Sequence, residues 1–390
     1  MIFAKNRRRN IIMDGWKTYE LGELLLYEQP TKYIVKSTDY NDSYATPVLT
    51  AGKSFILGYT SEEDGLYPQD GLPVIIFDDF TTSSKYVDFP FKVKSSAMKI
   101  LIPNTELVLP KYIFYRMQLI QFDHSTHKRY WIQQYSKLKV TIPRKIEQEK
   151  IVAKIEEMFS QLEDGEKMLQ KTKQQLTVYR QAVLKEAFEN VEKKQMIREL
   201  SQLVTSGSRG WAKYYSNEGA RFIRITDLTR DRIVLKDDNI QFVKLPEKAE
   251  GKRSRLKKSD VLVSITADLG SIALVPEDIE EAYINQHIAM IRFNNAVQSE
   301  FMAWYLKSEY GQKDLLKNKR GGGKLGLGLD DIRNTLVPVV NNEFAERIVR
   351  LINYRMTVCD NVEKEVESVL LQLEDIRQSI LKIAFEERLM

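Results

Sequence analysis

Residues 180–189 read Arg-Gln-Ala-Val-Leu-Lys-Glu-Ala-Phe-Glu, and residues 377–386, which lie 197 positions further along, read Arg-Gln-Ser-Ile-Leu-Lys-Ile-Ala-Phe-Glu. The same offset places Ile155 on Ile352, so the match extends well beyond ten residues. Self-similarity at a fixed offset reflects a repeated structural unit. The sequence of 390 residues therefore predicts a protein built from two similar halves.

Each repeated segment follows a proline, Pro143 or Pro338, and contains no further proline. Both segments are predicted to be helices of about 40 residues, or roughly 60 Å at 1.5 Å per residue. Apolar residues recur at every seventh position, which favours antiparallel pairing of the two helices as a coiled coil. The alternative is a surface helix on each domain, although helices this long are difficult to bury alone. The predicted pairing positions are Ile155, Leu162, Leu169, Leu176 and Val183 in the first copy and Ile352, Cys359, Val366, Leu373 and Ile380 in the second.

The repeat divides the chain into four predicted parts. They are a first globular domain at 14–142, a first long helix at 143–194, a second globular domain at 195–337 and a second long helix at 338–390. The fold class is expected to be α+β, with the helices forming an antiparallel coiled coil of approximate two-fold symmetry. Short helices are expected at 111–119 and 299–308. Strands are expected at 45–49, 74–77, 86–93, 98–102, 222–225, 261–265, 272–275 and 288–293.

The composition describes a folded protein with a mild basic excess. Hydrophobic residues make up 43% of the chain and the formal net charge is +5, which permits a polyanionic partner without requiring one. The single cysteine, Cys359, excludes an internal disulfide and fits a reducing compartment, so we expect a cytoplasmic protein. No apolar run approaches the roughly 20 residues that would cross a bilayer, so no membrane association is expected.

Both globular segments carry basic residues shortly before the shared proline. Lysine and arginine bind phosphates and guanine edges, whereas glutamine and asparagine match adenine edges, so these segments are candidate DNA contacts. A solvated loop without a ligand is the alternative for each cluster. The side chains predicted to face DNA are Lys128, Arg129, Tyr130, Gln133 and Tyr135 in the first domain and Arg224, Thr226, Lys319, Arg320 and Lys324 in the second.

Several blocks of the sequence resemble the specificity subunits of type I restriction-modification systems. The Ala-Phe-Glu sequences at the ends of both helices are the most specific of these marks. Residues 1–13 and the glycine-rich loop at 321–323 have no counterpart in the family pattern. The other matching blocks are 15–17 with 21–22, 47–52 with 77–81, 260–264 with 285–287, and the two proline-led helices.

The resemblance implies a subunit that reads double-stranded DNA for a larger complex that defends against foreign DNA. Each globular segment would be a target recognition domain for one part of a bipartite, asymmetric site, and the helices would set the gap between the two parts. Two modification (methyltransferase) subunits and the restriction/translocase subunits are the implied partners. S-adenosylmethionine, ATP and magnesium are expected on those partners, and this chain is expected to bind no cofactor itself.

Motifs for catalysis are missing from the sequence. Adenine methyltransferases need an Asn/Asp-Pro-Pro-aromatic motif, and the chain contains no Pro-Pro pair. The glycine-rich string at 321–326 follows no predicted strand, so it does not indicate a dinucleotide or phosphate site. Only three histidines are present, His124, His127 and His287, which makes a zinc site improbable. We therefore expect no catalytic residues, no metal site and a chain that is not an enzyme.

Two points stay open at this level. Asp78 and Asp79 fit a turn after a buried strand, cytosine readers or nuclease metal ligands, with the turn favoured. For the whole chain, the alternative to DNA recognition is a coiled-coil scaffold with two protein-binding lobes, which would bind with little dependence on salt. A self-contained nuclease or methyltransferase is disfavoured by the missing motifs.

Overall fold

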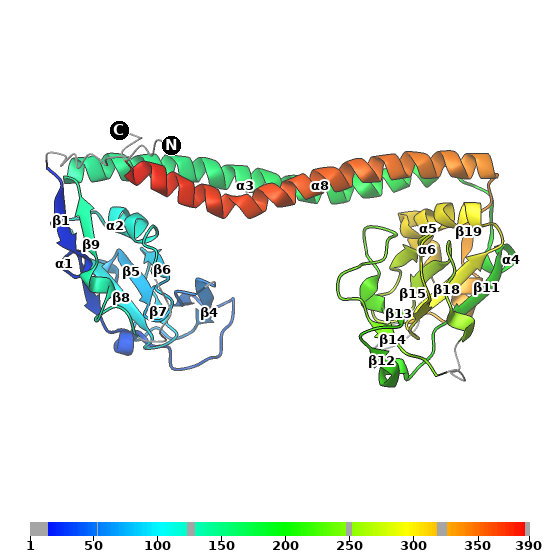
Figure 1. The fold of residues 1–390 in the computed structure, drawn as a ribbon, viewed down its shortest axis with the longest axis horizontal. Coiled ribbons are helices and arrows are strands. Elements are labelled where there is room, and N and C mark those ends of the chain that lie inside the picture. The colour runs from blue at the N-terminus through cyan, green and yellow to red at the C-terminus, as the bar shows by residue number, and fades with distance from the viewer. Residues whose placement is uncertain (1–14, 53, 123–128, 247–251, 318–325, 387–390) are drawn as a thin grey trace, which may run out of the picture. The chain divides into compact units, whose positions relative to one another are not determined.

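The computed structural model describes residues 15–52, 54–122, 129–246, 252–317 and 326–386. It forms two compact units: unit 1 contains residues 1–167 and 370–390, and unit 2 contains residues 168–369. Two long helices, α3 (Lys145–Phe188) and α8 (Asn342–Phe385), each contribute one part to each unit (Figure 1). The boundaries between the two units thus fall inside α3 and inside α8. The division into four parts that the sequence predicts, with each long helix separate from its domain, stays a prediction.

The globular part of unit 1, here called the first domain, contains three small sheets among its described residues. The pairs are antiparallel except β3 with β7, which is parallel. The sheet orders are β1 (Lys17–Glu20)-β9 (Lys139–Ile142), β2 (Leu25–Glu28)-β8 (Met98–Pro103)-β5 (Val74–Asp78)-β6 (Ser84–Val87), and β4 (Ile56–Thr60)-β3 (Thr46–Leu49)-β7 (Lys92–Val93). Its helices are α1 (Leu21–Leu24) and α2 (Pro110–Met117).

The globular part of unit 2, the second domain, also contains three sheets among its described residues. Here β13 pairs with β17 in parallel and the other pairs are antiparallel. The sheet orders are β10 (Lys194–Met196)-β19 (Leu336–Pro338), β11 (Ser201–Ser206)-β18 (Ile288–Phe293)-β15 (Val261–Ser264)-β16 (Ile272–Leu274), and β12 (Tyr215–Ser216)-β14 (Phe242–Val243)-β13 (Ala220–Ile223)-β17 (Ala282–Ile284). Its helices are α4 (Ile197–Leu200), α5 (Ser299–Lys307), α6 (Glu309–Leu315) and α7 (Leu329–Arg333).

The two domains repeat one topology. In both, a two-stranded sheet joins the first strand to the last, a four-stranded antiparallel sheet forms the centre, and a third sheet contains one parallel pair. A short helix, α1 or α4, follows the first strand in each. The predicted fold class is confirmed: each mixed strand and helix domain is followed by a helix of 44 residues.

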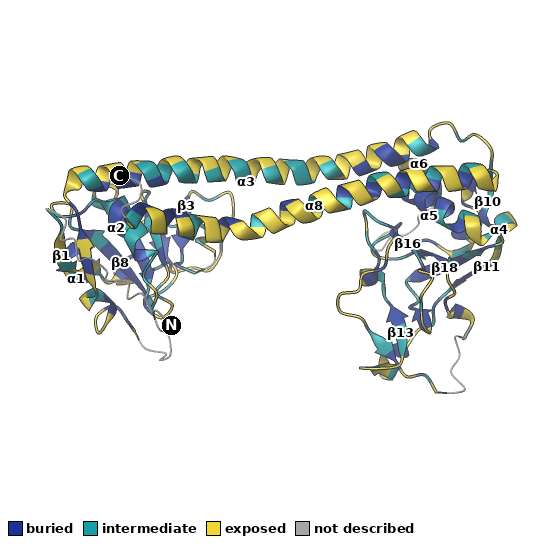
Figure 2. Ribbon diagram, turned by 45° about the horizontal axis from the view of Figure 1, so that its top comes forward, coloured by how far each residue is buried: buried dark blue, intermediate teal, exposed yellow. Residues whose placement is uncertain are grey.

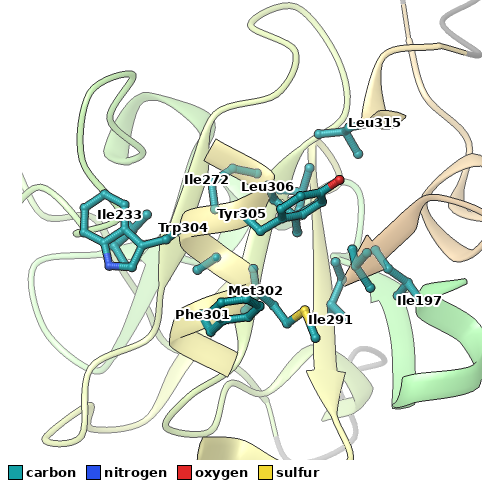
Figure 3. Close-up of a cluster of buried hydrophobic side chains, with 14 of the residues drawn as sticks. Ile197, Ile233, Ile272, Ile291, Phe301, Met302, Trp304, Tyr305, Leu306 and Leu315 are labelled. Carbon is teal, nitrogen blue, oxygen red and sulfur yellow. The ribbon is translucent and has the colours of Figure 1, made fainter. Parts of the chain in front are cut away.

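The core of each unit includes segments of both long helices. In unit 1, Ile155 near the start of α3 shares an apolar cluster with Leu381 near the end of α8. In unit 2, Val183 near the end of α3 shares a cluster with Ile352 near the start of α8. The helices therefore run antiparallel within each unit. Helix α5 is buried at every position except Glu300, which is half-buried, and it supplies the centre of the unit 2 cluster (Figure 3).

The predicted pairing positions differ in burial between the helices. On α8 all five are buried, namely Ile352, Cys359, Val366, Leu373 and Ile380. On α3, Ile155 and Val183 are buried, while Leu162, Leu169 and Leu176 are half-buried (Figure 2). Ion pairs add to the apolar contacts between the helices, as between Lys173 and Glu367 at 2.5 Å and between Arg355 and Glu186 at 2.5 Å.

Candidate nucleic-acid interface

The second domain contains a basic groove of about 890 Å³. Its walls come from the segments that follow β11, β15 and β17 and from the segment that precedes α7. Three cationic side chains line it, Arg209, Lys213 and Arg253, and among the described lining residues there is no Asp or Glu. A concave surface with cations and without carboxylates attracts a polyanion. We call this surface the basic groove.

The floor of the basic groove depends on a close approach between two strand ends. A Cβ added to Gly207 would lie 1.9 Å from the carbonyl oxygen of Ile284 and 2.4 Å from that of Asn285. Ser208 forms an isolated parallel bridge with Asn285 at the same point. Only glycine permits this approach, since any larger residue would force the two backbones apart.

A chain of hydrogen bonds fixes one side of the groove. Thr266 Oγ1 lies 2.5 Å from His287 Nδ1, and Gln286 Nε2 lies 2.9 Å from His287 Nε2. An amide nitrogen can only donate, so the imidazole accepts at Nε2 and, when neutral, donates from Nδ1 to the threonine hydroxyl. The backbone N–H of His287 donates to Asn285 Oδ1 at 3.1 Å. These bonds orient the Gln286 side chain at the groove wall before any ligand binds.

Aromatic packing supports the part of the groove lined by Trp211 and Lys213. Trp211 is buried and lies against the rings of Phe222 and Tyr283, with centroid distances of 5.6 Å and 5.3 Å. Lys213 lies over the ring of Tyr214, with its Nζ 5.0 Å from the centroid. A cation held against an aromatic face keeps its charge at the surface of the groove.

The residues predicted in the first domain have different environments. Arg129 and Gln133 are exposed, as a DNA contact requires. Tyr130 and Tyr135 are only 1% exposed and belong to the apolar cluster that holds the start of α3. Burial raises the pKa of the Tyr135 phenol. The prediction that these two tyrosines face DNA is not supported, because their rings form the core of the domain.

The two carboxylates at the end of β5, Asp78 and Asp79, support the same core. Asp78 Oδ1 accepts backbone hydrogen bonds from Phe80 and Thr81, each at 2.9 Å, as in a turn. Asp79 is buried, accepts a bond from the Trp131 backbone N–H at 2.8 Å and lies 3.5 Å from Lys99 Nζ. The favoured interpretation, a turn after a buried strand, fits these contacts.

The residues predicted in the second domain lie outside the basic groove or outside the described residues. Arg224 donates to Asp227 Oδ1 at 3.4 Å and to the Asn239 carbonyl at 2.8 Å. Thr226 is exposed and lines a separate hollow of about 400 Å³. Lys128, Lys319, Arg320 and Lys324 lie outside the described residues.

The cations of the basic groove were missed as specific candidates. Arg253 belongs to a visibly basic stretch at 252–258, and Arg209 stands between small residues at 207–210. A short basic segment bounded by glycines is a signal for close backbone approach to a ligand, and it could have identified Arg209.

A family model described as "Type I restriction modification DNA specificity domain" matches residues 13–175 and 192–369. The chain belongs to this family. The resemblance inferred from the sequence is thereby confirmed, and one match falls on each half of the repeat.

The curated relatives are named as specificity subunits of type I restriction enzymes. The chain is 55% identical over 126 residues to the specificity subunit of the Escherichia coli type I restriction enzyme EcoR124I/EcoR124II, covering 32% of this chain but only 31% of that subunit. It is 24% identical over 315 residues to the StySPI specificity subunit of Salmonella potsdam, covering 75% of this chain and 66% of that subunit.

Two solved structures share the fold. A chain from a study of complex assembly and conformational transition of the type I R-M system aligns with a TM-score of 0.66 and 18% identity, covering 95% of this chain and 98% of that one. The HsdS subunit of Thermoanaerobacter tengcongensis aligns with a TM-score of 0.53 and 16% identity, covering 96% and 97%.

None of the described helices combines the length and apolar character needed to cross a bilayer. No group of three His, Cys, Asp or Glu side chains suited to a metal ion occurs among the described residues.

Proposed function

We propose that this chain is the DNA-reading subunit of a type I restriction-modification complex and that its second domain contacts DNA through the basic groove. The observation that carries this proposal is the groove itself, with three cations, no described carboxylate and a preoriented glutamine. Phosphate contacts by Arg209, Lys213 and Arg253 would position the duplex, and polar groups on the wall would meet base edges. Because the two domains differ in their exposed residues, the site read is bipartite and asymmetric.

Catalysis in this proposal belongs to partner subunits in the cytoplasm. The chain contains no Pro-Pro pair for adenine methylation, so modification subunits would supply S-adenosylmethionine chemistry and restriction/translocase subunits the ATP and magnesium chemistry. We assign their docking surface to α8, where apolar side chains stay about 40% exposed at intervals of seven residues. These side chains are Val362 (39%), Val369 (39%), Ile376 (38%) and Ile383 (40%).

The test is DNA binding by the complex assembled with its modification subunits, measured over a range of salt concentrations. Each phosphate contact contributes about 0.9 to the slope of log affinity against log salt. The triple variant R209A/K213A/R253A should bind more weakly, and its slope should fall by about 2 to 3. The matched control K244A/K257A/K258A removes three exposed cations of the same domain outside the groove and should leave the slope unchanged.

Mapping methylated adenines in DNA exposed to the wild-type complex gives the independent check. Two half-sites separated by a fixed gap are the expected result. An unchanged salt slope in the triple variant would show that DNA does not bind in the basic groove. Failure of the wild-type complex to select any sequence would favour the scaffold alternative instead.

A further inference from the structure

Four charged side chains of unit 2 form one network between the second domain and the two helices. Arg180 on α3 donates to Asp360 Oδ1 at 2.7 Å and to Glu363 Oε2 at 2.8 Å, both on α8. Arg232, in the loop before Ile233, donates to the same Glu363 oxygen at 2.9 Å and lies 3.3 Å from Asp360 Oδ1. The two carboxylates therefore hold one arginine from the partner helix and one from the globular domain.

The centre of this network is shielded from solvent. The Arg180 side chain is 3% exposed and that of Glu363 is 16% exposed. Although burial acts in the opposite direction, the hydrogen bonds from Arg180 and Arg232 hold the pKa of Glu363 below its ordinary value. Charge pairs at such sites are screened less by salt than those on an open surface.

The loop that carries Arg232 is itself fixed to the core of the second domain. Buried Lys307, the last residue of α5, donates to the Thr229 carbonyl at 2.6 Å, and Thr229 Oγ1 donates to the Arg232 carbonyl at 2.7 Å. The next residue, Ile233, is buried in the cluster shown in Figure 3 and accepts a backbone bond from Leu274 at 2.7 Å. The loop that carries Arg232 is therefore anchored to the domain core, so the position of the Arg232 side chain and the position of the domain are coupled.

Unit 1 lacks this connection among its described residues. The repeat places Arg377 at the position of Arg180, and Arg377 pairs with Glu166 on α3 at 3.4 Å. No cation of the first domain joins that pair among the described residues. In unit 1 the first domain reaches α3 through a separate pair, Lys111 of α2 with Glu156. Among the described residues the network of four charges is therefore confined to unit 2 and does not follow from the repeated frame.

We propose that Arg232 is a positioning residue that fixes the angle of the second domain on the helix pair and thereby restricts the gap between the two half-sites. This inference rests on the proposed function. Arg232 lies outside the basic groove, so it acts on recognition only by orienting the domain. Losing it should leave each half-site readable while the permitted gap becomes broader.

The experiment uses the assembled complex and DNA duplexes that carry both half-sites at the preferred gap or at gaps one base pair shorter and longer. The wild type should prefer one gap. R232M, which keeps the apolar stem, should reduce that preference by about tenfold, equivalent to ~1.4 kcal/mol. R232K should restore part of the preference. R230M is the matched control, because Arg230 lies two residues away and pairs with Asp268 inside the domain.

A second variant approaches the contact from the helix. E363Q removes the charge that both arginines share but leaves each of them its contact with Asp360. It should therefore relax the gap in the same direction as R232M but less, with no change beyond that of R232M in the double variant. An unchanged gap preference in R232M, or equal relaxation in R230M, would overturn the inference while leaving DNA recognition standing. A wild-type complex without bipartite selection would overturn the proposed function, and this inference with it.

Discussion

Phe188 and Phe385 are the same residue of the repeated Ala-Phe-Glu sequence, yet they are held differently. Phe188 ends α3 in unit 2, is 2% exposed and contacts Phe301 and Tyr305 of α5 at centroid distances of 5.3 Å and 5.4 Å. Phe385 ends α8 in unit 1, is half-buried and contacts Tyr112 of α2 at 5.2 Å. Each long helix thus ends against a short helix of the domain that does not precede it.

This comparison explains why the Ala-Phe-Glu sequence is repeated. Each domain packs against the start of one long helix and the end of the other, as the two apolar clusters show. The end of a long helix packs against a globular domain in both units, so a phenylalanine occurs at the same position in both copies. The depth of burial differs because two rings cover Phe188, whereas one ring and the Arg116 guanidinium, 5.4 Å from the ring centroid, cover Phe385.

The largest effect is expected from truncating these two rings. F188A should destabilise unit 2 by about 3 to 5 kcal/mol, because a fully buried phenylalanine leaves a cavity. F385A should destabilise unit 1 by roughly half as much, since part of the ring already meets water. Hydrogen exchange read by mass spectrometry reports the two units separately and is the measurement of choice.

The control for this comparison is the part of the molecule in which hydrogen exchange increases. Each variant should raise exchange mainly in its own unit, and equal losses at the two positions would contradict the difference in burial. A loss confined to the long helices, with both domains unaffected, would contradict the docking role altogether.

The sequence predicted the frame of the molecule better than its interface. The helices preserve residue identity because both pack against each other and against similar surfaces, and most of the expected strands lie within one or two residues of observed ones. Comparing the two halves of the sequence did not reveal that the domains share one sheet topology, because different apolar residues can occupy equivalent buried strand positions. The segment expected as one strand at 86–93 is interrupted, with β6 ending at Val87 and β7 beginning at Lys92.

The residues predicted to face DNA do not coincide with the basic groove, and the reason is physical. Tyr130 and Tyr135 stand among basic residues, and the sequence does not distinguish an aromatic ring that faces a ligand from one that fills a core. The basic groove depends on Gly207 meeting Ile284 and Asn285, which are distant in the chain. Such a contact exists only once the sheets have formed.

A second comparison concerns the last residues of α2 and α5, both of which are buried. They are Met117 in the first domain and Lys307 in the second. Burial lowers the pKa of Lys307 to about 8. The Asp231 carboxylate opposes this shift, and Arg230 adds a smaller effect in the same direction as burial. The folded state therefore holds this proton less tightly than the unfolded state does.

The sign of the resulting pH dependence follows from linkage. Between pH 8 and the ordinary lysine value of 10.5, the unfolded chain binds more protons at this site, so stability rises with pH. Unit 2 should gain on the order of 1 to 3 kcal/mol over this window. K307M should abolish the rise, and M117K should create one in unit 1. A flat wild-type profile for unit 2 below pH 10 would show that Lys307 stays charged in the fold.

The smallest effect is expected from the arginines that link the helices, Arg180 and Arg377. R180M removes a side chain that is 3% exposed and leaves two carboxylates to Arg232 alone, which should cost about 1 to 2 kcal/mol in unit 2. Arg377 is 31% exposed and its partner Glu166 is 42% exposed, so R377M should cost about 0 to 1 kcal/mol in unit 1. Salt sharpens the test, because 1 M salt should reduce the small effect at Arg377 and leave most of the effect at Arg180. Equal sensitivity to salt at the two positions would mean that the Arg180–Glu363 pair is as open to solvent as Arg232, which is 37% exposed, and that Arg232 does not hold the second domain as tightly as its hydrogen bonds indicate.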